Sequence, residues 1–334
     1  MHSNSSQDRH LAVSTMRYTT HRLLLAALLV LLVIMSVRIP AIDSQEQNDL
    51  TGIKVAVYDG GSGSGSSDPR ESSMAALYWM FRWMDATVEI VNSSAIKAGA
   101  LDSFQMIAVP GGYAYDYYLD LGYSGASAIQ DFVSEGGAYW GSCAGAFYAC
   151  HEFKWTEYGR TGIYSYGLEL FPGRGVGPIA GIADWPDYAM TDVTMNTTNG
   201  IVDLSQEPST HSIMYYGGPY FETEGIQGIT VLASYNYNDM PAMIAFEHEE
   251  GRVFLAGPHP EWEEDSFRDG CMWDNSLEDN GTDWELCKAV ALWLASINGS
   301  PGPNPDFGLQ IMIALVACIG VIAVAALIIR SRRS

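Results

Sequence analysis

The chain has 334 residues and is strongly acidic, with 39 Asp and Glu residues against 17 Lys and Arg residues and a formal net charge of −22. Such a charge repels phosphate backbones, so the composition argues against a nucleic-acid partner. Hydrophobic residues make up 48% of the chain. Its length between two apolar terminal segments is sufficient for one domain with a single large core.

The N-terminal apolar segment, 23–37, is flanked by arginines. It predicts either the core of a signal peptide or a short transmembrane anchor that follows a cytoplasmic segment, 1–22. The sequence does not decide between these two alternatives. In both cases we expect the segment to direct the following domain out of the cytoplasm.

The C-terminal apolar segment, 309–329, is long enough to cross a bilayer and is closed by arginines. It predicts a transmembrane helix with a cytoplasmic basic tail, 330–334. A Pro/Gly linker, 299–308, precedes the helix. We therefore expect a membrane protein whose main domain, 51–298, lies outside the cytoplasm.

Strands and helices of similar length alternate through the first part of the main domain, which predicts a parallel sheet covered on both faces. The later segment 176–235 is rich in Thr, Val, Tyr and Gly, and it predicts antiparallel additions. The expected strands are 53–58, 87–91, 106–109 and the run before Cys143, and the expected helices are 70–84 and a segment near 124–135.

Residues 137–150 read GAYWGSCAGAFYAC, so that Cys143 follows an apolar run and is surrounded by small residues. The pattern G-x-C-x-G is typical of a nucleophile elbow, a tight strand-to-helix turn in which bulky neighbours would collide. The N-terminal amides of the following helix favour a thiolate, and the amide of Ala144 would face an oxyanion. The alternative interpretation is a buried structural cysteine in a Gly/Ala-rich junction.

A nucleophilic cysteine needs a base, and His259 in the segment GRVFLAGPHPEW is the best candidate because it follows a β-rich run. Glu261 would orient its imidazole. His151 lies too far along the expected helix to reach back, and we expect His211 and His248 to be solvated.

The segment MIAVPGGYAYDYY supplies a candidate oxyanion hole. An apolar strand runs into Gly111 and Gly112, whose backbone amides would face the sulfur from a neighbouring strand end. No metal site and no cofactor are expected, since the acidic segment 261–285 lacks EF-hand spacing and is interpreted as a solvated face.

These motifs in this order resemble the class I glutamine amidotransferase-like superfamily. The amino-acid sequences of three segments resemble the branch represented by the N-terminal domain of biotin-protein ligases. The segments EGGAYWGSCAGAFYA, MYYGGPYF and GRVFLAGPHPE carry the similarity, which extends over 53–297. The resemblance implies a flavodoxin-like three-layer α/β sandwich with a mostly parallel sheet and antiparallel additions. It also implies a nucleophile, a base, an orienting acid and two oxyanion donors, which are Cys143, His259, Glu261, Gly112 and Ala144.

One position departs from the superfamily pattern G-x-C-x-G-x-Q, because Phe147 stands where glutamine amidotransferases have Gln. This puts glutamine as a substrate in doubt. We assign substrate contacts to residues within and beside the motifs, namely Gly111, Tyr113, Phe147 and Gly218.

Cys271 and Cys287 bracket a loop rich in Asp, Asn and Gly, and we expect a disulfide between them in an oxidising compartment. Two functions remain open. The first is a membrane-anchored extracytoplasmic Cys-His-Glu hydrolase of amide or peptide bonds, acting on an unknown small-molecule or peptide substrate. The second is a non-catalytic ligand-binding or sensing module that keeps the elbow as a pocket.

Overall fold

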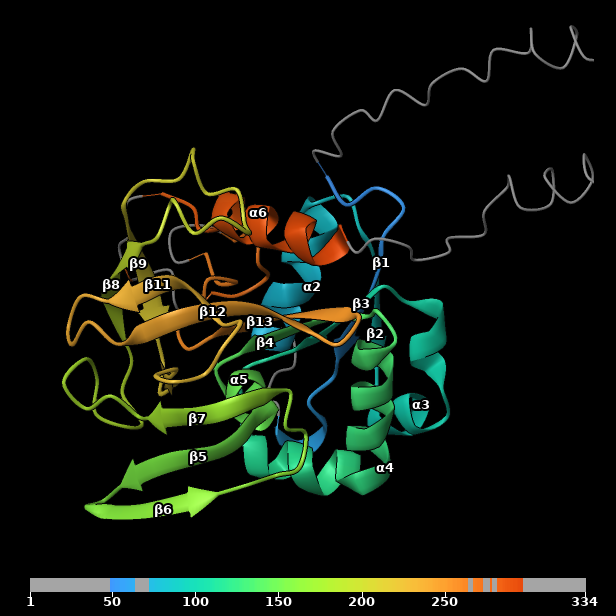
Figure 1. Cartoon of the computed structure of the whole chain (residues 1–334), viewed down its shortest axis with the longest axis horizontal. Helices are drawn as coiled ribbons and strands as arrows, with labels where there is room; N and C mark the ends of the chain where they lie inside the picture. The colour runs from blue at the N-terminus through green and yellow to red at the C-terminus, as the bar shows by residue number, and fades with distance from the viewer. Residues whose placement is uncertain (1–48, 64–71, 264–266, 273–276, 278–280, 297–334) are drawn as a thin grey trace, which may run out of the picture. The chain divides into compact units, whose positions relative to one another are not determined.

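The structure is a computed structural model, and it describes residues 49–63, 72–263, 267–272, 277 and 281–296. Strands and helices alternate in the first part of these residues, and a run of strands follows (Figure 1). In chain order the elements are β1 (Lys54–Tyr58), η1 (Gly61–Gly63), α2 (Ser73–Trp83), β2 (Thr87–Val91), α3 (Ser93–Lys97), η3 (Ala100–Ser103), β3 (Met106–Val109), α4 (Ala114–Ser134), β4 (Ala138–Ser142), α5 (Ala144–Ala149), β5 (Cys150–Glu157), β6 (Arg160–Tyr164), β7 (Phe171–Gly177), β8 (Ala189–Met195), β9 (Thr210–Tyr215), β10 (Tyr220–Glu222), β11 (Thr230–Tyr235), β12 (Pro241–His248), β13 (Gly251–Ala256) and α6 (Trp284–Ala295).

The main sheet has nine strands in the order β2-β1-β3-β4-β13-β12-β11-β8-β9. The strands from β2 to β13 in this order pair in parallel, and those from β13 to β9 pair antiparallel. This agrees with the expected parallel sheet with antiparallel additions, although the antiparallel half is as wide as the parallel half. Parallel neighbours need crossover connections, which α2 to α5 provide, whereas β12 and β13 are joined by a tight turn.

Both faces of the main sheet are buried. On β1, Val55 and Val57 belong to a core with α2 and α6, whereas Ala56 and Tyr58 belong to a second core with α4 and α5. The alternation arises because successive side chains of a strand point to opposite faces. Figure 1 shows α2 and α6 on one side of the sheet and α3, α4 and α5 on the other, which makes three layers.

A second sheet has four strands in the order β10-β7-β5-β6. Its strand β5 follows α5 directly, since α5 ends at Ala149 and β5 begins at Cys150. The strand β5 pairs in parallel with β7 and antiparallel with β6. Figure 1 shows β5, β6 and β7 beside α5, and residues of β5 and β6 line a pocket together with the elbow residue Cys143.

The expected helices are present, with different limits. The helix α2 begins after Ser72, whose hydroxyl accepts a hydrogen bond from the amide of Ala75, a typical N-cap contact. The helix α4 begins at Ala114, well before the expected start near 124, and continues across a kink at Gly122 with φ of 55°. The glycine allows the positive φ, and buried residues at helical spacing lie both before it (Ala114, Tyr117, Leu121) and after it.

The expected membrane anchorage is corrected by the structure. Within the part of the chain that the structure describes, no helix is long and apolar enough to cross a bilayer. The segments 23–37 and 309–329, on which the expectation rested, lie outside the described residues, as do 1–22, the linker 299–308 and the tail 330–334. The prediction of an extracytoplasmic domain depended on these segments, and it is withdrawn together with the prediction of membrane anchorage.

The acidic segment 261–285 is not the solvated face that we expected. Glu263 and Asp269 are buried. Arg268 and the hydroxyl of Thr282 both donate to Glu263, and the amides of Glu263 and Cys271 donate to Asp269. Burial raises the pKa of Glu263 to about 7, against the opposing effects of Thr282 and Arg268. The carboxylates thus hold the segment together internally.

His211 is also buried, contrary to the expectation of a solvated histidine. Its Nδ1 lies 2.8 Å from Asp283 Oδ1, and its Nε2 lies 3.2 Å from Glu207 Oε2. Burial lowers the pKa of His211, but the hydrogen bonds and charges of Asp283 and Glu207 outweigh this effect and raise it to about 9. A charged His211 therefore ties β9 to the start of α6.

We expect His211→Asn to lower the free energy of unfolding by about 3 kcal/mol near neutral pH, because it leaves the buried Asp283 and the partly buried Glu207 without their cation. The folded pKa of about 9 lies above the ordinary value of 6.5. The stabilisation is therefore complete below about pH 6.5 and is lost as the pH rises through about 9. Urea unfolding of both proteins at about pH 6 and about pH 10 measures the difference, which should shrink at the higher pH.

The exposed His151, which contacts Glu169 at 3.6 Å, provides the control. His151→Asn should change the free energy of unfolding by less than about 0.5 kcal/mol. An effect of His211→Asn that is equal at both pH values would contradict the charged pair.

Candidate active site

Cys143 lies between the last residue of β4 and the first residue of α5. Its backbone has φ of 48° and ψ of −102°, a conformation that a non-glycine residue adopts only under constraint. The Cys143 amide is fixed by a 2.8 Å hydrogen bond to the carbonyl of Ala256 on β13. These are the features of the predicted elbow.

The small residues around Cys143 have a direct explanation. A Cβ atom on Gly145 would lie 2.1 Å from the carbonyl oxygen of Val109, and one on Gly141 would lie 2.9 Å from the backbone of Gly145. Any side chain at Gly145 would therefore push the start of α5 away from the end of β3. The small residues allow the helix to begin directly against two strand ends.

His259 and Glu261 follow β13 and are both buried, with 2% and 0% of their surface exposed. His259 Nδ1 lies 2.8 Å from Glu261 Oε1. The ring of His259 stacks on Trp262 with centroids 4.1 Å apart, and its backbone amide donates to the carbonyl of Met214. Contacts of the ring face, of Nδ1 and of the backbone amide thus fix the orientation of His259.

His259 interacts electrostatically with both Glu261 and Cys143. Burial lowers the pKa of His259, but the charge of Glu261 and then the sulfur of Cys143 outweigh it and raise the pKa to about 10. An imidazolium next to a cysteine stabilises the thiolate. In the structure, the sulfur also lies 3.4 Å from the carbonyl oxygen of Tyr216, on the far side of the elbow.

Sequence reasoning missed Ser73. Its hydroxyl donates to Glu261 Oε1 at 2.5 Å and accepts a hydrogen bond from the amide of Gly111 at 2.8 Å. It therefore links the glycine loop after β3 to the carboxylate that holds His259. The available signal was a serine at the start of the predicted helix 70–84, which follows β1 at the same edge of the sheet as the motifs.

Gly111 and Gly112 lie so close to other parts of the chain that a side chain at either position would collide with them. A Cβ atom on Gly111 would lie 2.4 Å from His259 Cε1, and one on Gly112 would lie 2.0 Å from the carbonyl oxygen of Gly63. Gly112 also has φ of 148°. Gly112 and Ala144 border the same pocket as Cys143, so the structure brings the predicted oxyanion donors to the nucleophile. Their role as donors stays a prediction.

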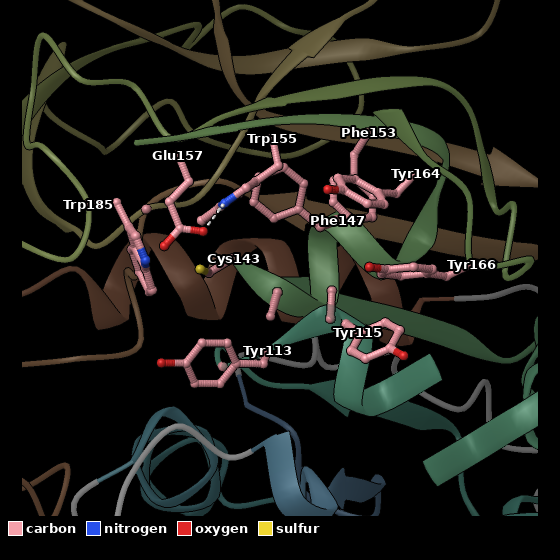
Figure 2. A pocket seen from close by; sticks show the side chains of 14 residues that line it. Tyr113, Tyr115, Cys143, Phe147, Phe153, Trp155, Glu157, Tyr164, Tyr166 and Trp185 are labelled. Carbon is pink, nitrogen blue, oxygen red and sulfur yellow. Dashed lines mark hydrogen bonds between the residues drawn. The ribbon is translucent and has the colours of Figure 1, made fainter. Parts of the chain in front are cut away.

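A pocket of about 440 Å³ opens in front of Cys143. Figure 2 shows it as a largely aromatic space with the sulfur at its floor. Tyr113 and Tyr115 come from the start of α4, and Trp185 comes from the loop after β7. The second sheet supplies the opposite wall, with Phe153, Trp155, Glu157 and Tyr164 among its members.

Phe147 lines this pocket and explains the departure from the amidotransferase pattern. Its ring packs on Phe153 and Trp155 of β5, at centroid distances of 5.1 and 5.7 Å. Phe147 thus packs α5 against aromatic residues of β5. A Gln at this position would present a polar amide to the same rings. Tyr113 also lines the pocket, as expected.

Gly218 does not line the pocket, although its neighbour Gly217 does. A Cβ atom on Gly218 would lie 1.8 Å from the carbonyl oxygen of Gly257, and its own carbonyl accepts a hydrogen bond from Tyr215. The residue therefore packs two backbone segments together. Gly111 likewise contacts His259 and is not among the pocket-lining residues.

The expected disulfide between Cys271 and Cys287 is absent, and both residues are free thiols. The Cys287 thiol donates to the carbonyl of Pro260 at 3.3 Å, and that of Cys271 lies 3.9 Å from the carbonyl of Ser72. Each sulfur is buried in its own packing site. Spacing in the sequence had suggested a disulfide that the structure does not form.

The doubly covered α/β sheet and the Cys–His–Glu constellation at the ends of parallel strands define a class I glutamine amidotransferase-like domain. Residues 53–283 match the family model described as "Biotin-protein ligase, N terminal", which covers most of the chain. The chain belongs to this family, as the motifs predicted.

Two curated relatives share about half of the chain. An uncharacterized protein of Chlamydia muridarum is 32% identical over 170 residues, which are 48% of this chain and 62% of that protein. A biotin–protein ligase of Schizosaccharomyces pombe is 30% identical over 168 residues, which are 48% of this chain and 26% of that protein. The chain thus spans less than two thirds of either relative.

Solved structures with a similar fold include a ThuA-like protein from Bacteroides uniformis, with a TM-score of 0.45 and 11% identity over 74% of this chain and 93% of that chain. A glutamine amidotransferase from Thermotoga maritima has a TM-score of 0.41 and 11% identity, over 65% and 80% of the two chains.

These findings correct the expected function. The family and the yeast relative are named for a biotin ligase, not for hydrolysis of amide or peptide bonds. The described residues also contain no membrane-spanning helix. The prediction of a membrane-anchored extracytoplasmic hydrolase is therefore wrong. What the family model and the ligase relative support is membership of an enzyme-related family.

We expect iodoacetamide to modify Cys143 before Cys150, because Cys143 borders the pocket whereas burial raises the pKa of the Cys150 thiol well above its ordinary value. His259→Ala should slow modification of Cys143 by about tenfold or more, since the imidazolium beside the sulfur is lost. Ser73→Ala should have a smaller effect through Glu261. Peptide mass spectrometry at timed intervals gives each rate.

Circular dichroism of the His259→Ala protein controls for loss of folding. A rate for Cys143 that does not respond to His259→Ala in a folded protein would show that the two side chains are not coupled.

Proposed function

We propose that this domain is a cysteine-dependent acyl-transfer module with a role related to biotin–protein ligation. The observation that carries the proposal is the buried His259–Glu261 pair beside the sulfur of Cys143, at the floor of an open pocket. A buried imidazole that is paired and charged next to a pocket-facing sulfur is typical of activated nucleophiles.

The chemistry follows from the residues present. The Cys143 sulfur attacks the carbonyl carbon of an activated acyl donor, and the amides of Gly112 and Ala144 stabilise the oxyanion. The bond to the leaving group breaks, and the leaving group takes a proton from the imidazolium of His259. The acyl group is then held on sulfur as a thioester, ready for transfer to an acceptor.

The acyl group is inferred from the family and the pocket. The matched family and the yeast relative are both named for biotin–protein ligase, so a biotinyl group is the first candidate. The aromatic walls suit an acyl group with a flat apolar body. Phe147 offers no amide to recognise glutamine, which supports an acyl donor other than glutamine.

We expect the full chain to take up one biotinyl group from the p-nitrophenyl ester of biotin, and to release nitrophenolate in equal amount. Intact-mass spectrometry detects the adduct, and peptide mapping should place it on Cys143. Hydroxylamine should remove it, because a thioester is cleaved by this nucleophile whereas an amide is not. The acetyl ester tests whether the aromatic pocket selects the larger acyl group.

Cys143→Ala should abolish the adduct, and Cys150→Ala should retain it as the matched cysteine control. An adduct that persists in Cys143→Ala, or the absence of any adduct in the folded wild-type protein, would overturn the proposal.

A further inference from the structure

The charge of the pocket restricts what it binds. Glu157 is the one carboxylate among the described residues that line the pocket, and these residues include no Lys, Arg or His. Burial raises the pKa of the lining residue Tyr166 to about 12, so this phenol adds no negative charge near pH 7. Beside the sulfur of Cys143, a ligand in this pocket therefore faces the carboxylate of Glu157 and aromatic rings, and no cationic side chain of a lining residue.

The carboxylate of Glu157 is held in place at the Cys143 side of the pocket. Its Oε2 accepts a hydrogen bond from Trp155 Nε1 at 3.2 Å. In the view of Figure 2, the carboxylate lies between the rings of Trp155 and Trp185, above the sulfur of Cys143. Arg160 faces Glu157 across the β5–β6 hairpin but is exposed, does not line the pocket and forms no ion pair with Glu157 in the described structure.

The aromatic rings beside Glu157 form a corner. Trp155 and Trp185 lie 5.3 Å apart with an interplanar angle of 76°, and Tyr113 meets Trp185 at 6.2 Å and 88°. Rings that meet near right angles line two sides of one volume, and an organic cation over a ring face within about 6 Å of its centroid is attracted to that ring. A neighbouring carboxylate adds the opposite charge.

We propose that this corner, formed by Trp155, Trp185, Tyr113 and Glu157, binds an organic ammonium group of the substrate. The inference rests on the proposed function only in treating the ligand as a reactant at Cys143. The ammonium group lies against the π-faces with Glu157 as its counter-charge. An anionic group is disfavoured at this end of the pocket, so a carboxylate substrate enters only as a neutral, activated acyl group.

Binding is measured with the full-chain Cys143→Ala protein, which keeps the pocket and forms no thioester. The probes are choline and its neutral isostere 3,3-dimethyl-1-butanol, with tryptophan fluorescence and calorimetry as readouts. We expect choline to bind at least about tenfold more tightly than the isostere, because only the cation interacts with the rings and the carboxylate. Measurements at several KCl concentrations remove the general attraction of a chain with net charge −22 for cations.

In the same background, Glu157→Gln should remove most of this preference, and Trp155→Leu should weaken choline binding. Glu250→Gln, a substitution of an exposed carboxylate in the β12–β13 turn, should leave it unchanged. Arg160→Gln should leave choline binding equal or stronger. Equal affinity for the two probes, or a preference that survives Glu157→Gln, would overturn the inference, as would tighter binding of free biotin than of choline.

The two proposals fail separately. Selective choline binding by a protein that never forms a thioester would support the cation site and overturn acyl transfer. Thioester formation together with equal binding of choline and its isostere would support acyl transfer and overturn the cation site.

Discussion

The contact between the start of α5 and the ends of β3 and β13 is the constraint on which the site depends. The amide of Cys143 bonds to Ala256, and the amide of Gly145 bonds to Pro110. Since β3, β4 and β13 are adjacent parallel strands, these bonds fix three strand ends against one helix. The loops that follow β3 and β13 then carry Gly111 and His259 to the same place. A bulkier residue at Gly145 would collide with Val109 and Pro110 and push the start of α5 away from the end of β3.

The second sheet turns this shared core into a particular binding site. Its strand β5 starts directly after α5, so the aromatic wall is covalently continuous with the elbow helix. Phe147 packs on Phe153 and Trp155, which couples the position of the wall to that of the helix. One continuous segment, 143–157, therefore carries both the candidate nucleophile and part of the pocket wall.

The parts of the site that are local in sequence could be predicted, and those that depend on distant contacts could not. The elbow and the His259–Glu261 pair each lie within a few residues, so spacing revealed them. Ser73 reaches Glu261 across 188 positions, and nothing near Ser73 in the sequence indicates the contact. Tyr113 and Phe147 lie in or beside the motifs and were predicted, whereas the other aromatic lining residues, from α4, β5, β6 and the segments after β6 and β7, were missed for a related reason. The acidic segment was misread since composition cannot show that Arg268 and Thr282 satisfy Glu263.

The charge on His259 also has a structural cause that is separate from catalysis. Glu261 is fully buried, and its Oε2 has no hydrogen-bond partner among the described residues. A buried carboxylate with an unmatched oxygen is costly unless a cation lies beside it. The imidazolium of His259 supplies that cation, and Ser73 supplies a further hydrogen bond. The folded chain therefore favours a protonated His259, and the same preference supplies the positive charge next to Cys143. Stability and nucleophile activation are therefore linked through one carboxylate, which contacts His259 two positions away in the sequence and Ser73 188 positions away.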